Sequence, residues 1–270
     1  MIEITSSQNP RIKSLLKLKN KRERQKTQLF LIEGYREVKR ATGANIEIDE
    51  LYICPELFLG KNENALIKEI ERKEKTIINC SKSVFEKISY RDRPDGLIAL
   101  AKQKHLLIDE LVQIVKEKSN PLFVVVESIE KPGNLGTILR SCDGAGVDGV
   151  IVCEEVTDIF NPNVVRASIG TLFTQPIIVA SPDEILKFFK LNKIKIVATS
   201  PDAKQVYYEN NFNIPIAIVM GSEQYGLSEK WLSESDLALS IPMLGVADSL
   251  NVATATTIML YEALRQRTRS

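Results

Sequence analysis

The chain has 270 residues, of which 44% are hydrophobic and 26% are charged, and its formal net charge is +1. This composition is typical of a globular protein and excludes a disordered or collagen-like chain, and the length is sufficient for two domains. Residues 1–15 contain no apolar segment of a signal peptide, and no window approaches the roughly 18 apolar residues of a membrane span. We therefore expect a soluble, cytoplasmic protein.

The first hundred residues alternate between helical and strand-like patterns, which predicts a small α/β domain. Helices are expected over residues 9–25, 35–45 and 63–73, and strands over residues 29–34, 48–54, 76–80 and 96–101. A polar segment at residues 102–107 follows the last of these strands. We place the domain boundary there, between Lys104 and His105.

A basic segment lies inside the first expected helix. Eight Lys or Arg residues and one acidic residue, Glu23, fall between Arg11 and Lys26. Such a segment is either a solvated helix face or a surface for a nucleic-acid phosphate backbone, and both interpretations remain open.

The second half of the chain predicts a mostly parallel sheet. Near-continuous Val and Ile runs separated by helical segments are typical of strands buried on both faces. The expected strands cover residues 122–128, 149–153, 176–180, 194–200, 216–222 and 237–243. In such sheets ligands bind beyond the carboxyl ends of the strands, so those ends are where a site is expected.

The segment after the first of these strands predicts a helix that carries one arginine on the face opposite its apolar residues. Pro132 and Gly133 make a turn, and Asn134 can cap the helix that follows. Arg140 projects from the side opposite the apolar stripe, which consists of Leu135, Ile138, Leu139 and Cys142. The glycine spacing is not GxGxxG, so it does not argue for a dinucleotide.

Two further strand ends carry polar residues. Gly221 ends one strand and Glu223 follows it in a loop. After the last strand Pro242 breaks the chain, and Ser249 or Asn251 can cap the final helix. Three such segments at one edge of a sheet predict a functional site.

The histidine and cysteine content limits the chemistry of this site. The single histidine, His105, lies among lysines, which argues against a Ser/His/Asp triad and a His-based zinc site. The four cysteines form no CxxC pair and lie in or beside apolar runs, so we expect buried, reduced thiols and no metal. Arg, Asn, Ser, Glu and backbone groups remain for chemistry.

Residues 132–150, 218–229 and 241–267 resemble the three motifs of the SpoU, or TrmH-type, RNA ribose methyltransferases of the SPOUT superfamily. The resemblance covers residues 120–267, and residues 161–173 are similar to a helix that these enzymes place after the second strand. The N-terminal half is similar to their substrate-binding domain of the ribosomal-protein L30e type. Lys131 departs from the family, because many members have Asp there.

The resemblance implies 2′-O-methylation of an RNA ribose with S-adenosylmethionine as cofactor. It implies an α/β protein with an L30e-like domain at residues 1–104 and a parallel-sheet domain with a trefoil knot at residues 105–270. Ribosomal RNA is favoured over transfer RNA. It further implies a homodimer in which the last helix, with Ala253 and Ala255, forms much of the interface.

The resemblance also assigns roles to residues of this chain. The candidate catalytic residues are Asn134, Arg140, Glu223, Ser249 and Asn251. The candidate cofactor contacts are Thr199, Ser200, Gly221, Ile241, Met243 and Leu250. The candidate RNA contacts are Arg11, Lys13, Lys17, Lys21, Arg22 and Arg24. Because guanidinium groups in proteins stay protonated, Arg140 is expected to bind a phosphate and stabilise the alkoxide rather than act as a base.

Two alternatives compete with this interpretation. A non-catalytic RNA-binding or ribosome-assembly protein could keep the fold, but the five candidate catalytic residues are all present. An unrelated nucleotide-dependent α/β enzyme would need a phosphate-binding loop, and the glycine spacings do not supply one.

Overall fold

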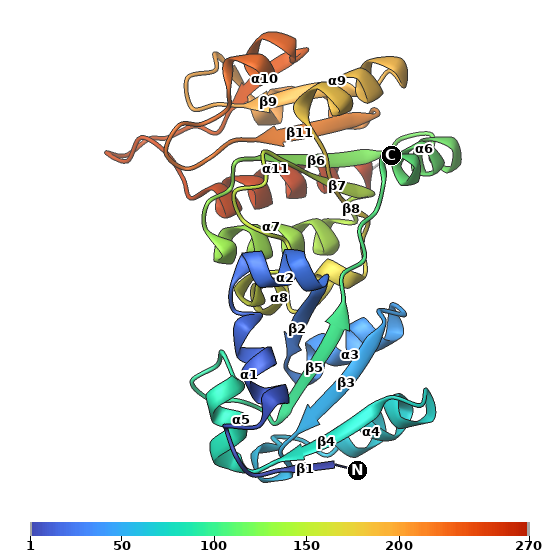
Figure 1. Cartoon of the computed structure of the whole chain (residues 1–270). Coiled ribbons are helices and arrows are strands. Elements are labelled where there is room, and N and C mark those ends of the chain that lie inside the picture. Colours follow the sequence, from blue (N-terminus) through green and yellow to red (C-terminus); the bar gives the residue numbers. More distant parts are fainter. Residues whose placement is uncertain (1, 269–270) are drawn as a thin grey trace. The chain divides into compact units, whose positions relative to one another are not determined.

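The computed structural model describes residues 2–268, and its contacts divide the chain into two units. The first unit holds the chain up to Lys104 together with Asp158–Thr174, and the second holds His105–Thr157 and the chain from Gln175 onward (Figure 1). The segment Asp158–Thr174 thus packs with the N-terminal half although it follows a strand of the second unit. None of the described helices is long and apolar enough to cross a membrane.

The first unit is built on a mixed five-stranded sheet in the order β1-β4-β3-β5-β2. β2 and β3 run antiparallel to β5, and the other pairs are parallel. Its strands are β1 (Ile2–Ile4), β2 (Leu29–Glu33), β3 (Ile48–Ile53), β4 (Thr76–Cys80) and β5 (Leu97–Lys102). Its helices are α1 (Pro10–Lys17), α2 (Lys21–Thr27), α3 (Tyr35–Gly43), α4 (Glu63–Arg72), α5 (Lys82–Ile88) and α8 (Pro162–Ala167), with short 3-10 turns at Pro55–Leu57 and Thr171–Phe173. Four of these strands lie at the expected places, whereas β1 was not expected.

The single helix expected over residues 9–25 is wrong, because the structure has two helices there, α1 and α2. The side chain of Asn20 accepts a hydrogen bond from the backbone N–H of Arg22 and caps α2. An N-cap starts a new helix, so the capping chemistry of Asn20 outweighs the continuous apolar spacing.

Because the chain forms two helices here, the Arg24 side chain points into the protein. Its side chain is 1% exposed and makes an ion pair of 2.7 Å with Asp158. Its guanidinium also donates to the backbone carbonyls of Leu18 and Lys19, at 2.7 and 3.0 Å. The prediction that Arg24 contacts RNA is therefore wrong, because its donors are used inside the first unit.

We expect Arg24→Ala to lower the free energy of unfolding by about 3–5 kcal/mol, because it leaves the carboxylate of Asp158 buried and unpaired. Urea denaturation followed by circular dichroism measures this change. Arg22, two residues earlier, is exposed, so Arg22→Ala is the matched control and should change stability by less than about 0.5 kcal/mol. Equal stability of the two variants would contradict a structural role for the buried pair.

The second unit is an all-parallel seven-stranded sheet in the order β10-β12-β9-β11-β6-β7-β8. The strands are β6 (Leu122–Glu127), β7 (Gly149–Cys153), β8 (Ile177–Val179), β9 (Lys195–Thr199), β10 (Gln205–Val206), β11 (Ile216–Met220) and β12 (Leu237–Ser240). The helices are α6 (Ile108–Glu117), α7 (Pro132–Ala145), α9 (Pro182–Leu191), α10 (Glu229–Glu234) and α11 (Val252–Arg267), with a 3-10 turn at Tyr207–Glu209. The parallel sheet is confirmed, and only the two-residue β10 was not expected.

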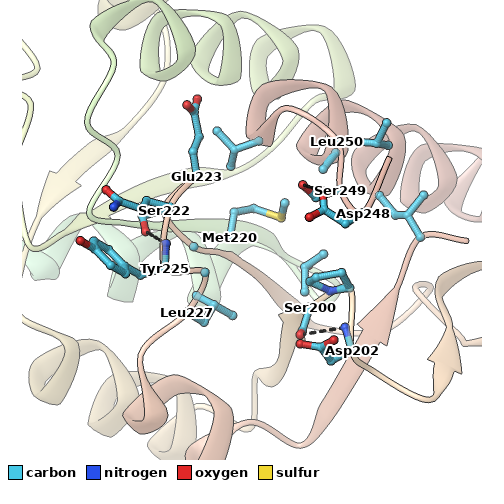
Figure 2. Close-up of a pocket in the computed structure, with 18 of the residues that line it drawn as sticks. Ser200, Asp202, Met220, Ser222, Glu223, Tyr225, Leu227, Asp248, Ser249 and Leu250 are labelled. Atoms are coloured by element: carbon cyan, nitrogen blue, oxygen red, sulfur yellow. Dashed lines mark hydrogen bonds between the residues drawn. The ribbon is translucent and has the colours of Figure 1, made fainter. Parts of the chain in front are cut away.

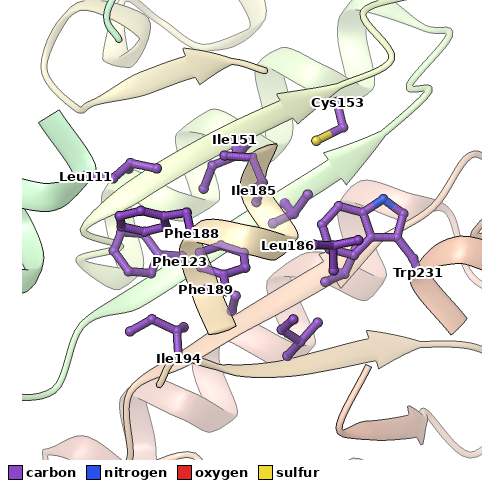
Figure 3. Close-up of a cluster of buried hydrophobic side chains, with 14 of the residues drawn as sticks. Leu111, Phe123, Ile151, Cys153, Ile185, Leu186, Phe188, Phe189, Ile194 and Trp231 are labelled. Atoms are coloured by element: carbon purple, nitrogen blue, oxygen red, sulfur yellow. The ribbon is translucent and has the colours of Figure 1, made fainter. Parts of the chain in front are cut away.

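Apolar side chains cover both faces of this sheet. On one face α9 and α10 place Phe188, Phe189 and Trp231 against Phe123 and other buried strand residues (Figure 3). The other face is covered by α7 and α11, which contact each other closely (Figure 1). Because every residue of β6 is buried, the sheet is closed on both sides and leaves its strand ends for ligands.

Candidate active site

A cavity of about 510 Å³ opens at the carboxyl ends of three neighbouring strands, β9, β11 and β12. Its walls come from the loops that follow these strands and from the start of α11. Figure 2 shows Met220 at the end of β11 together with residues of the three loops, which are Ser200 and Asp202, then Ser222, Glu223, Tyr225 and Leu227, and finally Asp248, Ser249 and Leu250. The volume lies within the range of about 300–1,000 Å³ that is usual for small-molecule sites.

The cavity wall combines apolar and acidic side chains. The acidic residues are Asp202, Glu223 and Asp248, and no Lys or Arg is among the described residues that line it. Apolar contacts come from Met220, Leu227, Leu232, Ile241, Met243, Leu250 and Val252. Like-charge repulsion disfavours an anionic ligand in such a cavity, so the wall suits a ligand that carries positive charge.

The loop after β11 is held in a tight turn. The backbone N–H of Ser222 donates to the carbonyl of Gly226 at 2.9 Å, and the N–H of Gly226 donates back at 3.1 Å. A Cβ added to Gly221 would lie 2.2–2.4 Å from backbone atoms of Gly226 and Leu227. Gly221 is therefore required by the close approach of two backbone segments.

Glu127, at the end of β6, holds the other side of this loop. It is 4% exposed, and its carboxylate accepts hydrogen bonds from the backbone N–H and the hydroxyl of Ser228, at 2.8 and 2.7 Å. Ser228 is the residue before α10, so the carboxylate fixes where the cavity loop joins that helix. No sequence signal singled out Glu127, because an acidic residue that follows an apolar run is also what the solvent-exposed end of a strand would show.

We expect Glu127→Ala to weaken binding of the small ligand of this cavity by roughly tenfold, because it removes both hydrogen bonds that the carboxylate accepts from Ser228, and a hydrogen bond to a charged group contributes about 1.5–3 kcal/mol. Isothermal titration calorimetry with S-adenosylmethionine measures the effect. Glu127→Gln keeps a carbonyl acceptor and should recover part of the affinity. Wild-type affinity in Glu127→Ala would contradict this positioning role.

A polar network joins the start of α7 to the cavity loops. The amide nitrogen of Asn251 donates to Oδ1 of Asn134 at 3.2 Å and to Oε1 of Glu223 at 3.4 Å. On the other side, the Lys131 ammonium pairs with Oε2 of Glu223 at 2.5 Å. This carboxylate raises the pKa of Lys131, through a hydrogen bond first and its charge second, so the ammonium stays protonated.

The structure corrects the expected helix cap at Asn134. α7 begins at Pro132, with Lys131 at the cap position, and the side chain of Asn134 faces Asn251 instead. Asn251 itself caps α11, because its Oδ1 accepts from the backbone N–H of Ala253 at 3.0 Å and of Thr254 at 3.4 Å. The side-chain nitrogen of Asn134 is buried and has no hydrogen-bond partner among the described residues.

The cavity gathers most of the site residues named from the sequence. All six candidate cofactor contacts line it, and Glu223 and Ser249 do so as well. Asn134 and Asn251 adjoin it through their hydrogen bonds. Arg140 is exposed on α7 and does not line the cavity, and its guanidinium has no ion-pair or hydrogen-bond partner among residues 2–268. The structure therefore does not bring Arg140 into this site within one chain.

The candidate RNA contacts lie in the first unit. Lys13, Lys17 and Arg22 are exposed, and Lys21 is half-buried. Arg11 is exposed and pairs with Glu50. Apart from Arg24, these side chains remain compatible with a phosphate-binding surface on α1 and α2.

The four cysteines are free and buried, as expected, and burial raises the pKa of Cys80 to about 11 and that of Cys153 to about 12. Such thiols are unreactive near neutral pH. Within residues 2–268 no group of three His, Cys, Asp or Glu side chains could hold a metal ion.

Comparison with protein families and solved structures supports one assignment. Residues 121–261 match the SpoU rRNA Methylase family, and residues 9–99 match an MRM3-like substrate binding domain. The chain is 29% identical to the 23S rRNA (guanosine(2553)-2′-O)-methyltransferase RlmP of Bacillus subtilis, over 97% of this chain and 98% of that protein. It is 31% identical to a 23S rRNA (uridine(2479)-2′-O)-methyltransferase of Streptomyces viridochromogenes, over 93% of this chain and 87% of that protein.

Solved structures match over almost the whole chain. A crystal structure of an RNA 2′-O ribose methyltransferase superimposes with a TM-score of 0.84 at 37% identity, over 99% of this chain and 100% of that one. An AdoMet-bound rRNA methyltransferase from Sinorhizobium meliloti gives a TM-score of 0.86 at 30% identity, over 97% of each chain. Together with the three loops at the strand ends, these matches show that the chain belongs to the SpoU rRNA methylase family.

Proposed function

We propose that this protein transfers the methyl group of S-adenosylmethionine to the 2′-hydroxyl of a ribose in 23S ribosomal RNA. The observation that carries the proposal is the cavity at the carboxyl ends of β9, β11 and β12, which gathers the six candidate cofactor contacts beside Asn134, Asn251 and Glu223. The curated relatives described above are 23S rRNA 2′-O-methyltransferases that act on different nucleotides, guanosine in one and uridine in the other.

The cavity fits S-adenosylmethionine in size, charge and polar contacts. The cofactor carries a sulfonium cation. The described lining residues include three carboxylates and no Lys or Arg, which favours positive charge there. The hydroxyl of Thr199 is buried at the end of β9 and has no hydrogen-bond partner in the described chain, so it is free to bind a polar ligand. Gly221, Ile241 and Leu250 would hold the cofactor through backbone groups, and Met243 and Ser200 would complete the wall.

When bound, the cofactor supplies an electrophilic methyl group on sulfur. The ribose hydroxyl must lose its proton as it attacks, so the protein has to orient the ribose and stabilise the developing alkoxide. Ser249 and Asn251 would hydrogen-bond the ribose. Asn134 and Glu223 fix Asn251 in turn, through bonds to its amide nitrogen.

Arg140 enters this site from a second copy of the chain in our proposal. Its exposed guanidinium has no ion-pair partner in residues 2–268 and lies outside the cavity of its own chain. A homodimer through α7 and α11 would supply it across the interface, where it would bind an RNA phosphate in a bidentate manner and stabilise the alkoxide. Light scattering of the purified protein tests the dimer.

Ala255, which the resemblance places in the dimer interface, has a second neighbour in the structure. Ala255 lines the cavity, so a larger side chain there would obstruct the small ligand in addition to any effect on association. The exposed apolar residues Leu244 and Val246, in the loop before α11, and Tyr261 on α11 are better candidates for the interface. The trefoil knot implied by the resemblance and the cytoplasmic location stay predictions.

Transfer of radiolabelled methyl groups to isolated RNA classes tests the substrate. We expect label in 23S rRNA, as free RNA or in the large subunit, and none in 16S rRNA or transfer RNA. Label only in transfer RNA would contradict the proposed substrate. Tight binding of S-adenosylmethionine without label in any RNA would favour a non-catalytic assembly protein.

A further inference from the structure

Lys131 places a positive charge beside one carboxylate of the acidic cavity. It immediately precedes α7, and its ammonium pairs with Oε2 of Glu223, a cavity-lining residue, at 2.5 Å. The Lys131 side chain is 68% exposed and that of Glu223 is 24% exposed. The ammonium is thus joined to the active site on one side and open to solvent on the other.

Lysine is a poor residue for this position of a helix. Its side chain cannot accept a hydrogen bond from the first turn, and a cation is repelled by the positive end of the helix dipole. α7 has no side-chain cap bond and no acidic residue in its first turn that would offset this repulsion. The lysine therefore does not serve the helix, and residues that break a local rule in this way are often functional.

The charges of the cavity create a need for such a cation. A ribose in RNA is flanked by two phosphates, and Asp202, Glu223 and Asp248 would repel them as the ribose approaches the cavity. Among the ion pairs of residues 2–268, the pair from Lys131 is the one that reaches a cavity-lining carboxylate. Lys131 is thus positioned to offset this repulsion within its own chain.

We propose that Lys131 binds an RNA phosphate next to the target ribose, and that Glu223 occupies its ammonium until the RNA arrives. This inference rests on the proposed function, since it needs an RNA substrate at this cavity. An exposed ion pair contributes little free energy, so a phosphate can replace Glu223 at low cost. An ammonium has three donor hydrogens, so it can also bind the phosphate while it keeps one bond to the carboxylate.

Release of the ammonium has a consequence for Glu223. Oε1 of its carboxylate remains bonded to Asn251 at 3.4 Å, so the side chain keeps its place when Oε2 loses the lysine. Oε2 then becomes available to a group that arrives with the RNA or with a second copy of the chain.

The salt dependence of RNA binding tests the proposal. The probe is a fluorescent 23S rRNA fragment that contains the ribose methylated by the wild-type enzyme. Fluorescence anisotropy gives the Kd at about four KCl concentrations, from roughly 50 to 300 mM. We expect Lys131→Gln to weaken binding roughly fivefold near 0.15 M salt. The slope of log K against log salt should fall in magnitude by about 0.7–0.9, because one fewer counterion is released.

The controls separate this role from damage to the fold or the cavity. Lys190, on α9, also forms an exposed pair with a glutamate, Glu234, away from the cavity, so Lys190→Gln should leave the slope unchanged. Lys131→Arg should keep the wild-type slope, and Lys131→Gln should bind S-adenosylmethionine as the wild type does. An unchanged slope in Lys131→Gln would overturn the inference while leaving the methyltransferase intact. Absence of label from every RNA with the wild-type enzyme would instead overturn the proposed function.

Discussion

Replacement of Arg140 by lysine is expected to reduce methyl transfer by about 10²–10³-fold while the affinity for S-adenosylmethionine stays within twofold of the wild type. Loss of one donor that stabilises a developing oxyanion has effects of that size. Lysine keeps the charge but cannot present the planar pair of donors that binds a phosphate in a bidentate manner. Affinity should survive, because Arg140 does not line the cavity.

Single-turnover methyl transfer and calorimetric titration measure the two quantities for Arg140→Lys. Arg265 is an exposed arginine of the same unit that pairs with Glu262, so Arg265→Lys is the matched control and should keep wild-type turnover. Near-normal turnover in Arg140→Lys would remove Arg140 from the proposed mechanism. A parallel loss of cofactor affinity would place it in the cofactor site instead.

Replacement of Gly221 by alanine has the second large expected effect, and here it is the affinity for S-adenosylmethionine that should fall. The added Cβ would lie 2.2 Å from the carbonyl carbon of Gly226, and both partners are backbone that cannot rotate away. Overpacking costs about 1–3 kcal/mol, which is roughly 5- to 150-fold in Kd, and a backbone contact this short favours the upper end. We therefore expect weak binding of S-adenosylmethionine at the disrupted turn.

Calorimetric titration of Gly221→Ala tests this expectation. Gly43, at the end of α3, has no atom within 4 Å of an added Cβ, so Gly43→Ala is the control and should bind S-adenosylmethionine normally. Normal affinity in Gly221→Ala would mean that the turn after β11 does not shape the cofactor site.

The second unit was largely predictable from the sequence because its signals are strong and local. Continuous Val and Ile runs such as residues 122–126 are buried on both faces and pair in parallel, as expected. Gly221 and Asn251 could be recognised from their place at a strand end and before a helix. Gly221 lines the cavity and Asn251 adjoins it through Glu223, in agreement with the rule that ligands bind at the carboxyl edge of a parallel sheet.

The predictions that failed concern residues whose roles depend on a partner far away in the sequence. Arg24 looks like any other basic residue of a charged segment, and only Asp158, which is 134 positions away, makes it a buried ion-pair residue. Asn134 has the right chemistry for a cap, but its side chain bonds Asn251 across 117 positions. Glu127 and Lys131 were given no role for the same reason, since their partners Ser228 and Glu223 belong to another loop.

The strands β1 and β10 were missed for a different reason. They have three and two residues, which is too short for an alternating pattern to stand out. Their pairing with β4 and β12 depends on a neighbouring strand that already exists. Short edge strands of this kind follow from tertiary structure rather than from local sequence.

Mapping of the methylated position tests the central claim most directly. Ribosomal RNA incubated with the wild-type enzyme and S-adenosylmethionine is cleaved with alkali, which cannot cut the backbone after a 2′-O-methylated ribose. The account predicts protection at one nucleotide of 23S rRNA, with no protection when Arg140→Ala replaces the wild type. Label on a base, with every backbone position still cleaved, would contradict 2′-O-methylation by this protein.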